Sequence, residues 1–213
     1  MSAPRPEDAS GQLDNLRTMF RDSIHEHGVT SAGVGWPDPA THKLRFDKLA
    51  TVFEGNSGGF SVNDLGAGWG ALFPYLVEER GFDVERYVGY EVSPEMLAAA
   101  RATVTDSRAT FVEASSATQD ADYSIACGTF NVKCDANDDD WLEYVLRSLR
   151  ALAERSARGL AFNMMSTYVD WRNEILYYGD PGFFFDFCKR ELSRSVALLH
   201  DYPLWEWTIV VRL

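Results

Sequence analysis

The feature that most constrains this chain is a glycine-rich turn directly after a short apolar run. The run Phe60-Ser61-Val62-Asn63-Asp64-Leu65 enters Gly66-Ala67-Gly68-Trp69-Gly70, and a helical pattern follows at once. Glycines there let the backbone bend sharply and approach a ligand, while N–H groups at the helix start face a polar or anionic group. The next apolar run, Tyr87-Val88-Gly89-Tyr90, ends at Glu91, whose carboxylate can accept both hydroxyls of a ribose. The turn and Glu91 together predict an adenosine-binding crevice.

Short apolar runs alternate with helical patterns along most of the chain. Strands are expected at 60–65, 87–92, 110–112, 123–126 and 159–165, and helices at 69–80, 94–104 and 141–153. This alternation is typical of an α/β fold with a parallel sheet and helices on both faces. The last part differs, because a helix at 183–192 precedes two strands, 195–200 and 206–213. These two strands predict an antiparallel hairpin at the sheet edge.

Two helices are expected before the glycine turn. Apolar residues recur at helical spacing over 13–24, and Gly28 supplies a stop. The second helix begins at Asp38, a capping residue that is followed by Pro39 in the first helical position. We therefore predict one domain, with an N-terminal helical cap over residues 1–55 and a cofactor-binding core over residues 56–213.

The composition limits the partners and the location of the protein. A formal net charge of −12, with no dense Lys/Arg cluster, disfavours a nucleic-acid partner. The first eight residues carry acidic and proline residues instead of a secretion signal, and the apolar runs are too short to span a membrane, so a cytoplasmic protein is expected. Cys127, Cys134 and Cys188 lack the spacing of a zinc site or of a disulfide framework, and no metal site is predicted.

The glycines alone also fit a dinucleotide fingerprint, Gly66-x-Gly68-x-x-Ala71. Two observations favour a different ligand, S-adenosylmethionine (SAM). Asp64 precedes the first glycine by two residues, where a buried carboxylate suits the ammonium of a methionine moiety, and about 60 residues precede the turn, whereas dinucleotide folds usually begin near it. A non-catalytic SAM- or nucleotide-binding module and an NAD-linked oxidoreductase stay open as alternatives.

The segments Val62–Gly70 and Tyr87–Leu97, taken in succession, resemble the class I, Rossmann-like, SAM-dependent methyltransferases over residues 60–213. The resemblance implies a seven-stranded, mostly parallel sheet with an antiparallel last strand, and SAM across the carboxyl ends of the first strands, with S-adenosylhomocysteine (SAH) as product. It implies that Asp64, Gly66 and Gly68 hold the methionine end, Glu91 the ribose, and Val92 and Met96 the adenine, with Ala67 and Cys127 also at the cofactor. Core packing is the alternative for Val92 and Met96, and a buried small residue is the alternative for Cys127.

The family often places an acidic residue just after the third strand, where it meets the adenine amino group. This chain reads Phe111-Val112-Glu113-Ala114-Ser115-Ser116 there, without a carboxylate at the expected position. Ser115 is our candidate for the adenine contact, and a displaced Glu113 is the alternative.

Methyl transfer needs an aligned nucleophile, exclusion of water and sometimes a base. Asn131, after the fourth strand, is a candidate for orienting a polar group of the substrate, and a loop-capping role is the alternative. His200 and Asp201 follow the sixth strand, and a histidine there can take a proton near neutral pH if that strand is parallel. A structural role for both residues is the alternative.

Aromatic residues supply the candidates for binding the methyl acceptor. Tyr168 and Tyr178 lie in the long connection after the fifth strand, and Tyr202 follows Asp201. Such side chains can pack on a planar substrate, although an ordinary loop covering the sheet is an equal alternative. Methyltransferases that act on the bases of nucleic acids resemble one another in carrying an acidic residue or Asn, two prolines and an aromatic residue after the fourth strand. This motif is missing here, which disfavours a nucleic-acid base as the methyl acceptor.

A finer resemblance links this chain to a little-characterised group of bacterial methyltransferases. Its residues are Gly35-Trp36, Lys43-x-Arg45-Phe46, Gly128-Thr129-Phe130-Asn131 and His200-Asp201-Tyr202-Pro203. It implies that Trp36 and Arg45 line the site, with Arg45 near the methionine carboxylate; a surface salt bridge is the alternative for Arg45. We expect a monomer or homodimer that methylates an oxygen or nitrogen of a small molecule, with a protein acceptor as a further possibility.

Overall fold

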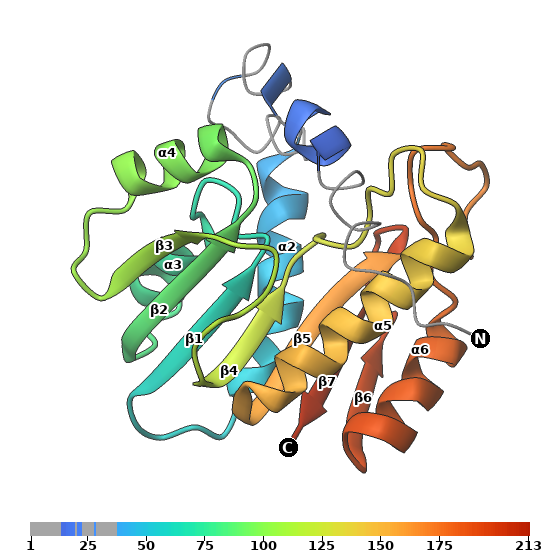
Figure 1. Ribbon diagram of the computed structural model, residues 1–213. Coiled ribbons are helices and arrows are strands. Elements are labelled where there is room, and N and C mark those ends of the chain that lie inside the picture. Colours follow the sequence, from blue (N-terminus) through green and yellow to red (C-terminus); the bar gives the residue numbers. More distant parts are fainter. Residues whose placement is uncertain (1–13, 20, 23–27, 29–37) are drawn as a thin grey trace.

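A seven-stranded sheet forms the centre of the computed structural model, which describes residues 14–19, 21–22, 28 and 38–213 (Figure 1). The strand order is β3-β2-β1-β4-β5-β7-β6. The strands are β1 (Phe60–Leu65), β2 (Val84–Glu91), β3 (Ala109–Glu113), β4 (Ala121–Ala126), β5 (Ser156–Met165), β6 (Ser195–Leu199) and β7 (Glu206–Arg212).

Strands β1 to β5 pair in parallel, and β7 is antiparallel to both of its neighbours, β5 and β6. Because β7 lies between them, β6 runs in the same direction as β5. The predicted α/β class, the parallel sheet and the antiparallel terminal hairpin are therefore confirmed. The strand expected at 87–92 begins earlier, at Val84.

Helical elements connect and flank the strands. They are α2 (Pro39–Leu49), η2 (Ala50–Phe53), α3 (Leu72–Pro74), η3 (Tyr75–Glu79), α4 (Pro94–Thr103), α5 (Asp138–Glu154), α6 (Pro181–Phe187) and η4 (Cys188–Leu192). The predicted start of α2 is confirmed, since the Asp38 carboxylate accepts a hydrogen bond of 3.0 Å from the backbone N–H of Ala40. The helix expected at 69–80 consists of the short α3 and the π-helical turn η3, which begins directly after Pro74. Pro74 has no backbone N–H to donate to the hydrogen bonds of an α-helix.

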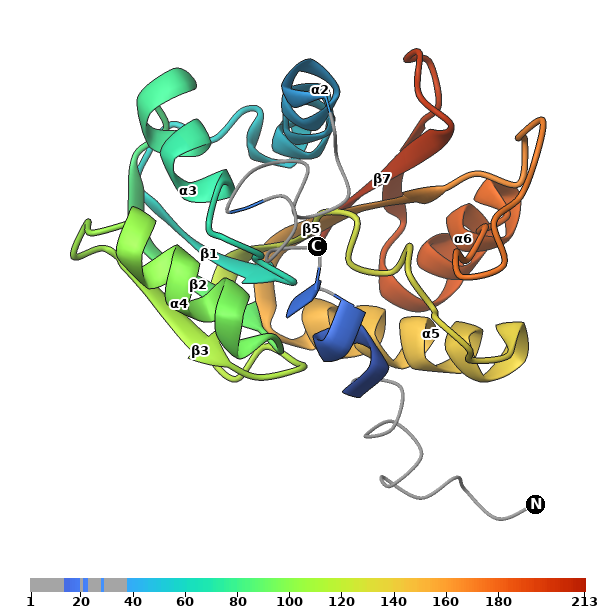
Figure 2. The ribbon, with the colours of Figure 1, turned by 90° about the horizontal axis from the view of Figure 1, so that it is seen from above.

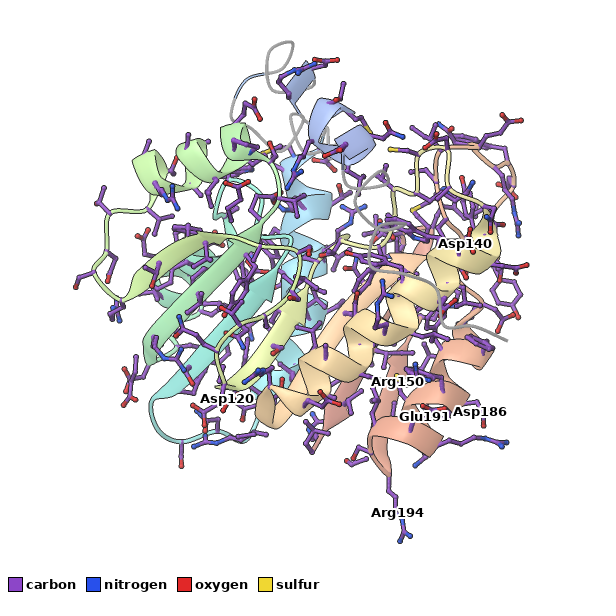
Figure 3. All side chains as sticks on the ribbon, in the orientation of Figure 1. Asp120, Asp140, Arg150, Asp186, Glu191 and Arg194 are labelled. Carbon is purple, nitrogen blue, oxygen red and sulfur yellow. The ribbon has the colours of Figure 1, made fainter. Side chains whose placement is uncertain are left out.

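The helices cover both faces of the sheet (Figure 2). Buried side chains of α5 and α6 form one apolar cluster on one face, and those of α2, α3 and α4 form a second cluster on the other face. Successive residues of β5 point to opposite faces, so Leu160 and Phe162 join the first cluster while Ala161 joins the second. On the outer surface, Arg150 of α5 pairs with Glu191 of η4 at 2.8 Å (Figure 3).

The helical residues 14–19 lie over the edge of the sheet where the parallel strands end (dark blue in Figures 1 and 2). Leu16 is buried against the core, and Arg17 donates a hydrogen bond of 2.9 Å to the carbonyl of Val92. Asn15 donates one of 2.7 Å to Asp135. This segment is thus held from two sides, after β2 and after β4. Among the described residues, no helix combines the length and apolarity needed to cross a membrane.

The pairing of β5 with β7 leaves no space for a side chain at Gly159. A Cβ atom there would lie 2.5 Å from the backbone oxygen of Val211, which the sheet prevents from moving. We expect Gly159→Ala to lower the free energy of unfolding in urea by about 1–3 kcal/mol. Gly58→Ala is the matched control, because a Cβ built there has no described atom within 4 Å apart from Gly58 and its two chain neighbours. Equal stability of the two variants would contradict this account of the β5–β7 contact.

Candidate active site

The glycine turn adopts a conformation that requires glycine. Gly66, Gly68 and Gly70 have φ angles of +73°, +54° and +82°, in the left-handed region that other residues rarely adopt. A Cβ atom at Gly66 would also lie 2.7 Å from Oγ1 of Thr129. The backbone N–H groups of Gly66 and Ala67 donate to the carbonyl of Tyr90 at 2.8 and 3.1 Å. The turn after β1 is thereby fastened to the end of β2.

The carboxylate of Glu91 is buried beside this turn and is held by three backbone N–H groups. Its Oε1 accepts from Val92 at 2.7 Å and from Ser93 at 2.9 Å, and its Oε2 accepts from Gly68 at 2.9 Å. Burial raises the pKa of Glu91, against the opposing effect of these hydrogen bonds. Because a carboxylate oxygen can accept two hydrogen bonds, Oε2 retains capacity for a hydroxyl of a ligand.

A pocket of about 330 Å³, the main pocket, opens between the sheet edge and the helical residues 14–19. One half is formed at the ends of β1, β2 and β3 by Leu65, Gly66, Gly68, Tyr90, Glu91, Val92, Met96, Ala114 and Ser115. The other half is formed after β4 and β5 by Cys127, Gly128, Thr129, Asn131, Val132, Met165, Ile175 and Leu176. Leu16, Met19 and Tyr144 complete the lining. Eight of the residues predicted from the sequence therefore meet in this pocket, namely Gly66, Gly68, Glu91, Val92, Met96, Ser115, Cys127 and Asn131.

A smaller cavity of about 50 Å³ adjoins the main pocket, with which it shares Gly66, Gly68 and Cys127. Asp64, another predicted residue, borders this small cavity and receives a hydrogen bond from the Tyr87 hydroxyl. Burial and the nearby charge of Glu91 raise the pKa of Asp64 to about 7, although the bond from Tyr87 opposes this shift. The carboxyl group of Asp64 therefore titrates near neutral pH.

Ala67, His42 and Trp69 also border the small cavity. Burial and the charge of Arg45 lower the pKa of His42 to about 4, so its ring is neutral at physiological pH. The indole N–H of Trp69 is buried and has no hydrogen-bond partner among the described residues. The small cavity is thus bordered both by a carboxyl group and by the residue that carries this N–H group.

A buried polar chain lies behind the site. Arg45 of α2 donates from Nε to both carboxylate oxygens of Glu206, at 2.9 and 3.0 Å, and Nδ2 of Asn163 donates to the same carboxylate at 2.5 Å. Oδ1 of Asn163 then accepts from the backbone N–H of Gly128 at 2.7 Å. We call Arg45, Glu206, Asn163 and Gly128 the buried network. It fixes the turn at Gly128, whose φ is +67° and which borders the main pocket.

The buried network gives Arg45 a different environment from the one expected. Its guanidinium pairs with Glu206 inside the protein, where the two side chains are 7% and 1% exposed. Arg45 therefore does not form the surface salt bridge that was the alternative for this residue. Arg45 borders neither the main pocket nor the small cavity. Trp36, the other residue of that prediction, lies outside the described residues.

The other candidate catalytic and acceptor residues do not border the main pocket. His200 follows β6 at the expected edge, but β6 is the outermost strand on that side, and the histidine ring is exposed with its centroid 5.9 Å from that of Tyr168. Asp201 is 73% exposed and pairs with Lys48 at 2.9 Å, and the hydrogen bond from Lys48 lowers the pKa of Asp201.

The three tyrosines differ in their environments. Tyr168 is 68% exposed. The hydroxyl of Tyr178 accepts from the backbone N–H of Asn173 at 2.8 Å, and the buried Tyr202 hydroxyl lies 2.9 Å from Oγ1 of Thr208. The described structure thus gives these residues local contacts and brings none of them to the main pocket.

Sequence reasoning missed the apolar lining and the buried network. Leu16 and Met19 belong to the helix expected at 13–24 in the predicted cap, of which residues 14–19 and 21–22 are described as helical, but no pattern singled out these two side chains as lining of the pocket. Asn163 and Glu206 did carry a signal, since each is a polar residue in an otherwise apolar strand and each is almost fully buried, at 0% and 1% exposure. Such residues need polar partners inside the protein.

The fold and the turn with its bonded carboxylate define a class I, Rossmann-like, methyltransferase. No family model matches the chain. The chain is 46% identical over 156 residues to "Putative methyltransferase Rv1506c" of Mycobacterium tuberculosis (strain ATCC 25618 / H37Rv), a match that covers 72% of this chain and 93% of the relative. The chain therefore belongs to the SAM-dependent methyltransferases.

Two solved structures share the fold. Magnesium protoporphyrin IX methyltransferase (ChlM) from Synechocystis PCC 6803, with bound SAM, has a TM-score of 0.65 at 14% identity, and the match covers 100% of both chains. The DhpI–SAH complex has a TM-score of 0.63 at 17% identity, covering 95% of this chain and 97% of the other. At these identities the likeness concerns the fold alone.

The buried network predicts a specific pattern of stability. Arg45→Met leaves the Glu206 carboxylate buried without its counter-charge and should lower the free energy of unfolding by about 3–5 kcal/mol. Adding Glu206→Gln removes the charge while keeping an oxygen for Asn163, so the double variant should recover about 2 kcal/mol or more of this loss. Urea denaturation of both variants measures the difference. A double variant that is no more stable than Arg45→Met would contradict the network.

Proposed function

We propose that this protein transfers a methyl group from SAM to an oxygen or nitrogen of a small-molecule acceptor. The observation that carries the proposal is the bond between Gly68 N–H and the buried Glu91 carboxylate at the wall of the main pocket. A glycine turn with an acidic residue at the end of the next strand suits an adenosine. The volume of about 330 Å³ suits a small organic ligand.

The residues of the pocket fit SAM along its whole length. Glu91 would accept one ribose hydroxyl through the remaining capacity of Oε2, and Val92, Met96 and Ser115 would contact the adenine. The methionine end would lie against Gly66, Ala67 and Gly68 and toward the small cavity, where Asp64 faces the ammonium. The unpartnered N–H of Trp69 is suited to the methionine carboxylate.

The chemistry that SAM supplies is a methyl carbon on a positively charged sulfur: the acceptor atom forms a bond to this carbon as the sulfur–carbon bond breaks, SAH leaves, and the acceptor's proton passes to solvent. The protein must align the acceptor and exclude water. Leu16 and Met19 support this role, since they cover the main pocket with apolar side chains. Their position also supports the proposed division into a cap, residues 1–55, and a core, residues 56–213.

The remaining parts of the proposal concern partners and location. The predominantly apolar lining and the net charge of −12 favour a small molecule over nucleic acid. A cytoplasmic location and a monomer or homodimer remain our predictions. His200, Asp201, Tyr168, Tyr178 and Tyr202 stay candidates only for an acceptor that extends beyond the main pocket. A non-catalytic binding module would bind SAM yet form no SAH with any acceptor.

Calorimetric titration with SAM, SAH and NAD tests the cofactor. We expect the wild type to bind SAM and SAH in preference to NAD, and Glu91→Ala to weaken both by about tenfold or more, the contribution of a hydrogen bond to a charged group. Glu85→Ala is the control, because Glu85 is an exposed glutamate of the same strand, β2, and borders neither the main pocket nor the small cavity. Since Glu91→Ala also frees three N–H groups, its unfolding temperature is measured in parallel, and Glu91→Gln provides an isosteric variant. Binding of NAD alone would contradict the proposal.

The affinity for SAM should depend on pH through Asp64. With its pKa raised to about 7, the Asp64 carboxyl group is mostly protonated at pH 6 and mostly ionised at pH 8. An ammonium binds the ionised form, so the dissociation constant for SAM should fall by about fourfold from pH 6 to pH 8, less than the change in Asp64 ionisation because the α-amino group of SAM itself begins to lose its proton near pH 8. Asp64→Asn should remove this dependence, and 5′-methylthioadenosine, which lacks the methionine end, should not show it. The same pH dependence in Asp64→Asn would exclude Asp64 as its source.

A further inference from the structure

The amide of Asn131 is bonded through its oxygen, whereas its nitrogen has no hydrogen-bond partner in the described part of the chain. Its side chain is 3% exposed, and Oδ1 accepts a hydrogen bond of 2.9 Å from the backbone N–H of Met165. That donor requires an acceptor, which fixes the carbonyl end of the amide and leaves Nδ2 pointing elsewhere. Nδ2 has no hydrogen-bond partner among the described residues, and Asn131 borders the main pocket. A buried amide donor without a partner is unfavourable unless a ligand supplies one.

The backbone around Asn131 is held firmly, so this N–H has a defined position. The N–H of Asn131 donates to Gly128 at 3.1 Å, and its carbonyl accepts from Tyr177 at 2.8 Å. The indole of Trp141 donates to the neighbouring carbonyl of Phe130 at 2.9 Å. The exit of β4 is therefore bonded to α5, to the end of β5 and to the segment before α6.

Apolar side chains surround the amide in its half of the main pocket. Val132, Met165, Ile175 and Leu176 line this half, and Leu16 and Met19 cover the pocket. The hydroxyl of Thr129 is already used, since it donates to the carbonyl of Leu65 at 2.6 Å. Among the described lining residues, the one charged side chain is Glu91, which lies in the opposite half. Apart from the Thr129 hydroxyl and the Asn131 amide, the described side chains of this half are apolar, and none of them is charged.

An outer cavity adjoins this half and shares Met19 and Ile175 with it. Its other lining residues are Asn15, Lys133, Cys134, Asp135 and Glu174. The Lys133 ammonium lies 3.4 Å from Asp138 and donates to the carbonyl of Ala136, so it is already compensated. Asp135 and Glu174 add negative charge to the opening. This entrance disfavours an anion, and the described lining of the half around Asn131 offers a cation no counter-charge.

We propose that the methyl acceptor is an uncharged, largely apolar molecule that enters through the outer cavity and places a hydrogen-bond-accepting oxygen on Nδ2 of Asn131. This inference rests on the proposed function, because it assigns the half of the main pocket that SAM would leave open. Asn131 is thus a specificity-determining residue that reads an oxygen of the acceptor.

Four probes with the same apolar body test the proposal. They are 2-acetylnaphthalene, with a neutral carbonyl; 2-naphthoate, an anion; 2-(aminomethyl)naphthalene, a cation; and 2-ethylnaphthalene, with no polar group. Each is titrated by NMR into the wild-type protein saturated with SAH. We expect 2-acetylnaphthalene to bind about fivefold or more tightly than each of the other three, the size of one modest hydrogen bond.

Two variants connect this preference to Asn131. Asn131→Leu removes the donor and should make 2-acetylnaphthalene and 2-ethylnaphthalene bind equally. Asn131→Asp keeps an oxygen for the Met165 N–H, so it controls for folding, and it should shift the preference to 2-(aminomethyl)naphthalene. SAH titration of each variant verifies that the cofactor half is intact.

The outcomes separate the two proposals. If the wild type binds SAH but binds no probe, prefers a charged probe, or keeps its preference for 2-acetylnaphthalene in both variants, the inference about the acceptor is wrong while the proposed function stands. If the wild type does not bind SAH, both are overturned.

Discussion

The hydrogen bond from Gly68 N–H to the Glu91 carboxylate is the contact on which the site depends. It joins the turn after β1 to the end of β2, and it forms only because the glycines adopt positive φ angles and Glu91 is buried beside them. The bond fixes a carboxylate at the pocket wall without the help of another side chain. Its geometry explains why the glycine turn, which follows β1, and Glu91, which ends β2, belong to one site.

The two halves of the main pocket are built in different ways. The half around Glu91 consists largely of backbone turns, so its shape follows from local φ angles and strand ends. The half around Asn131 depends on distant contacts, because the buried network holds Gly128 through Asn163, and Met165 holds the Asn131 amide. This division matches the proposed chemistry, in which the first half holds a cofactor common to the family and the second half selects the acceptor.

The sequence predicts what depends on neighbouring residues. The bounds of β1, the cap at Asp38 and the carboxylate at Glu91 follow from short patterns, and the structure has all three. The pairing of Arg45 with Glu206 joins residues 161 positions apart, and no local pattern identifies such a partner. His200 illustrates the same limit, because the hairpin lies at the predicted sheet edge, but β7 and not β6 pairs with β5, which leaves the strand before His200 outermost. Strand order and partner choice depend on the packing of the whole sheet.

A crystal structure of the SAH complex tests the central claim most directly. We predict that a ribose hydroxyl lies within hydrogen-bonding distance of Glu91 Oε2, that the adenine lies against Val92 and Met96, and that the amino group of the homocysteine moiety lies beside Asp64. The half around Asn131 should remain open, with Nδ2 bonded at most to water. Adenosine bound in the half around Asn131, or SAH bound away from the glycine turn, would contradict this account.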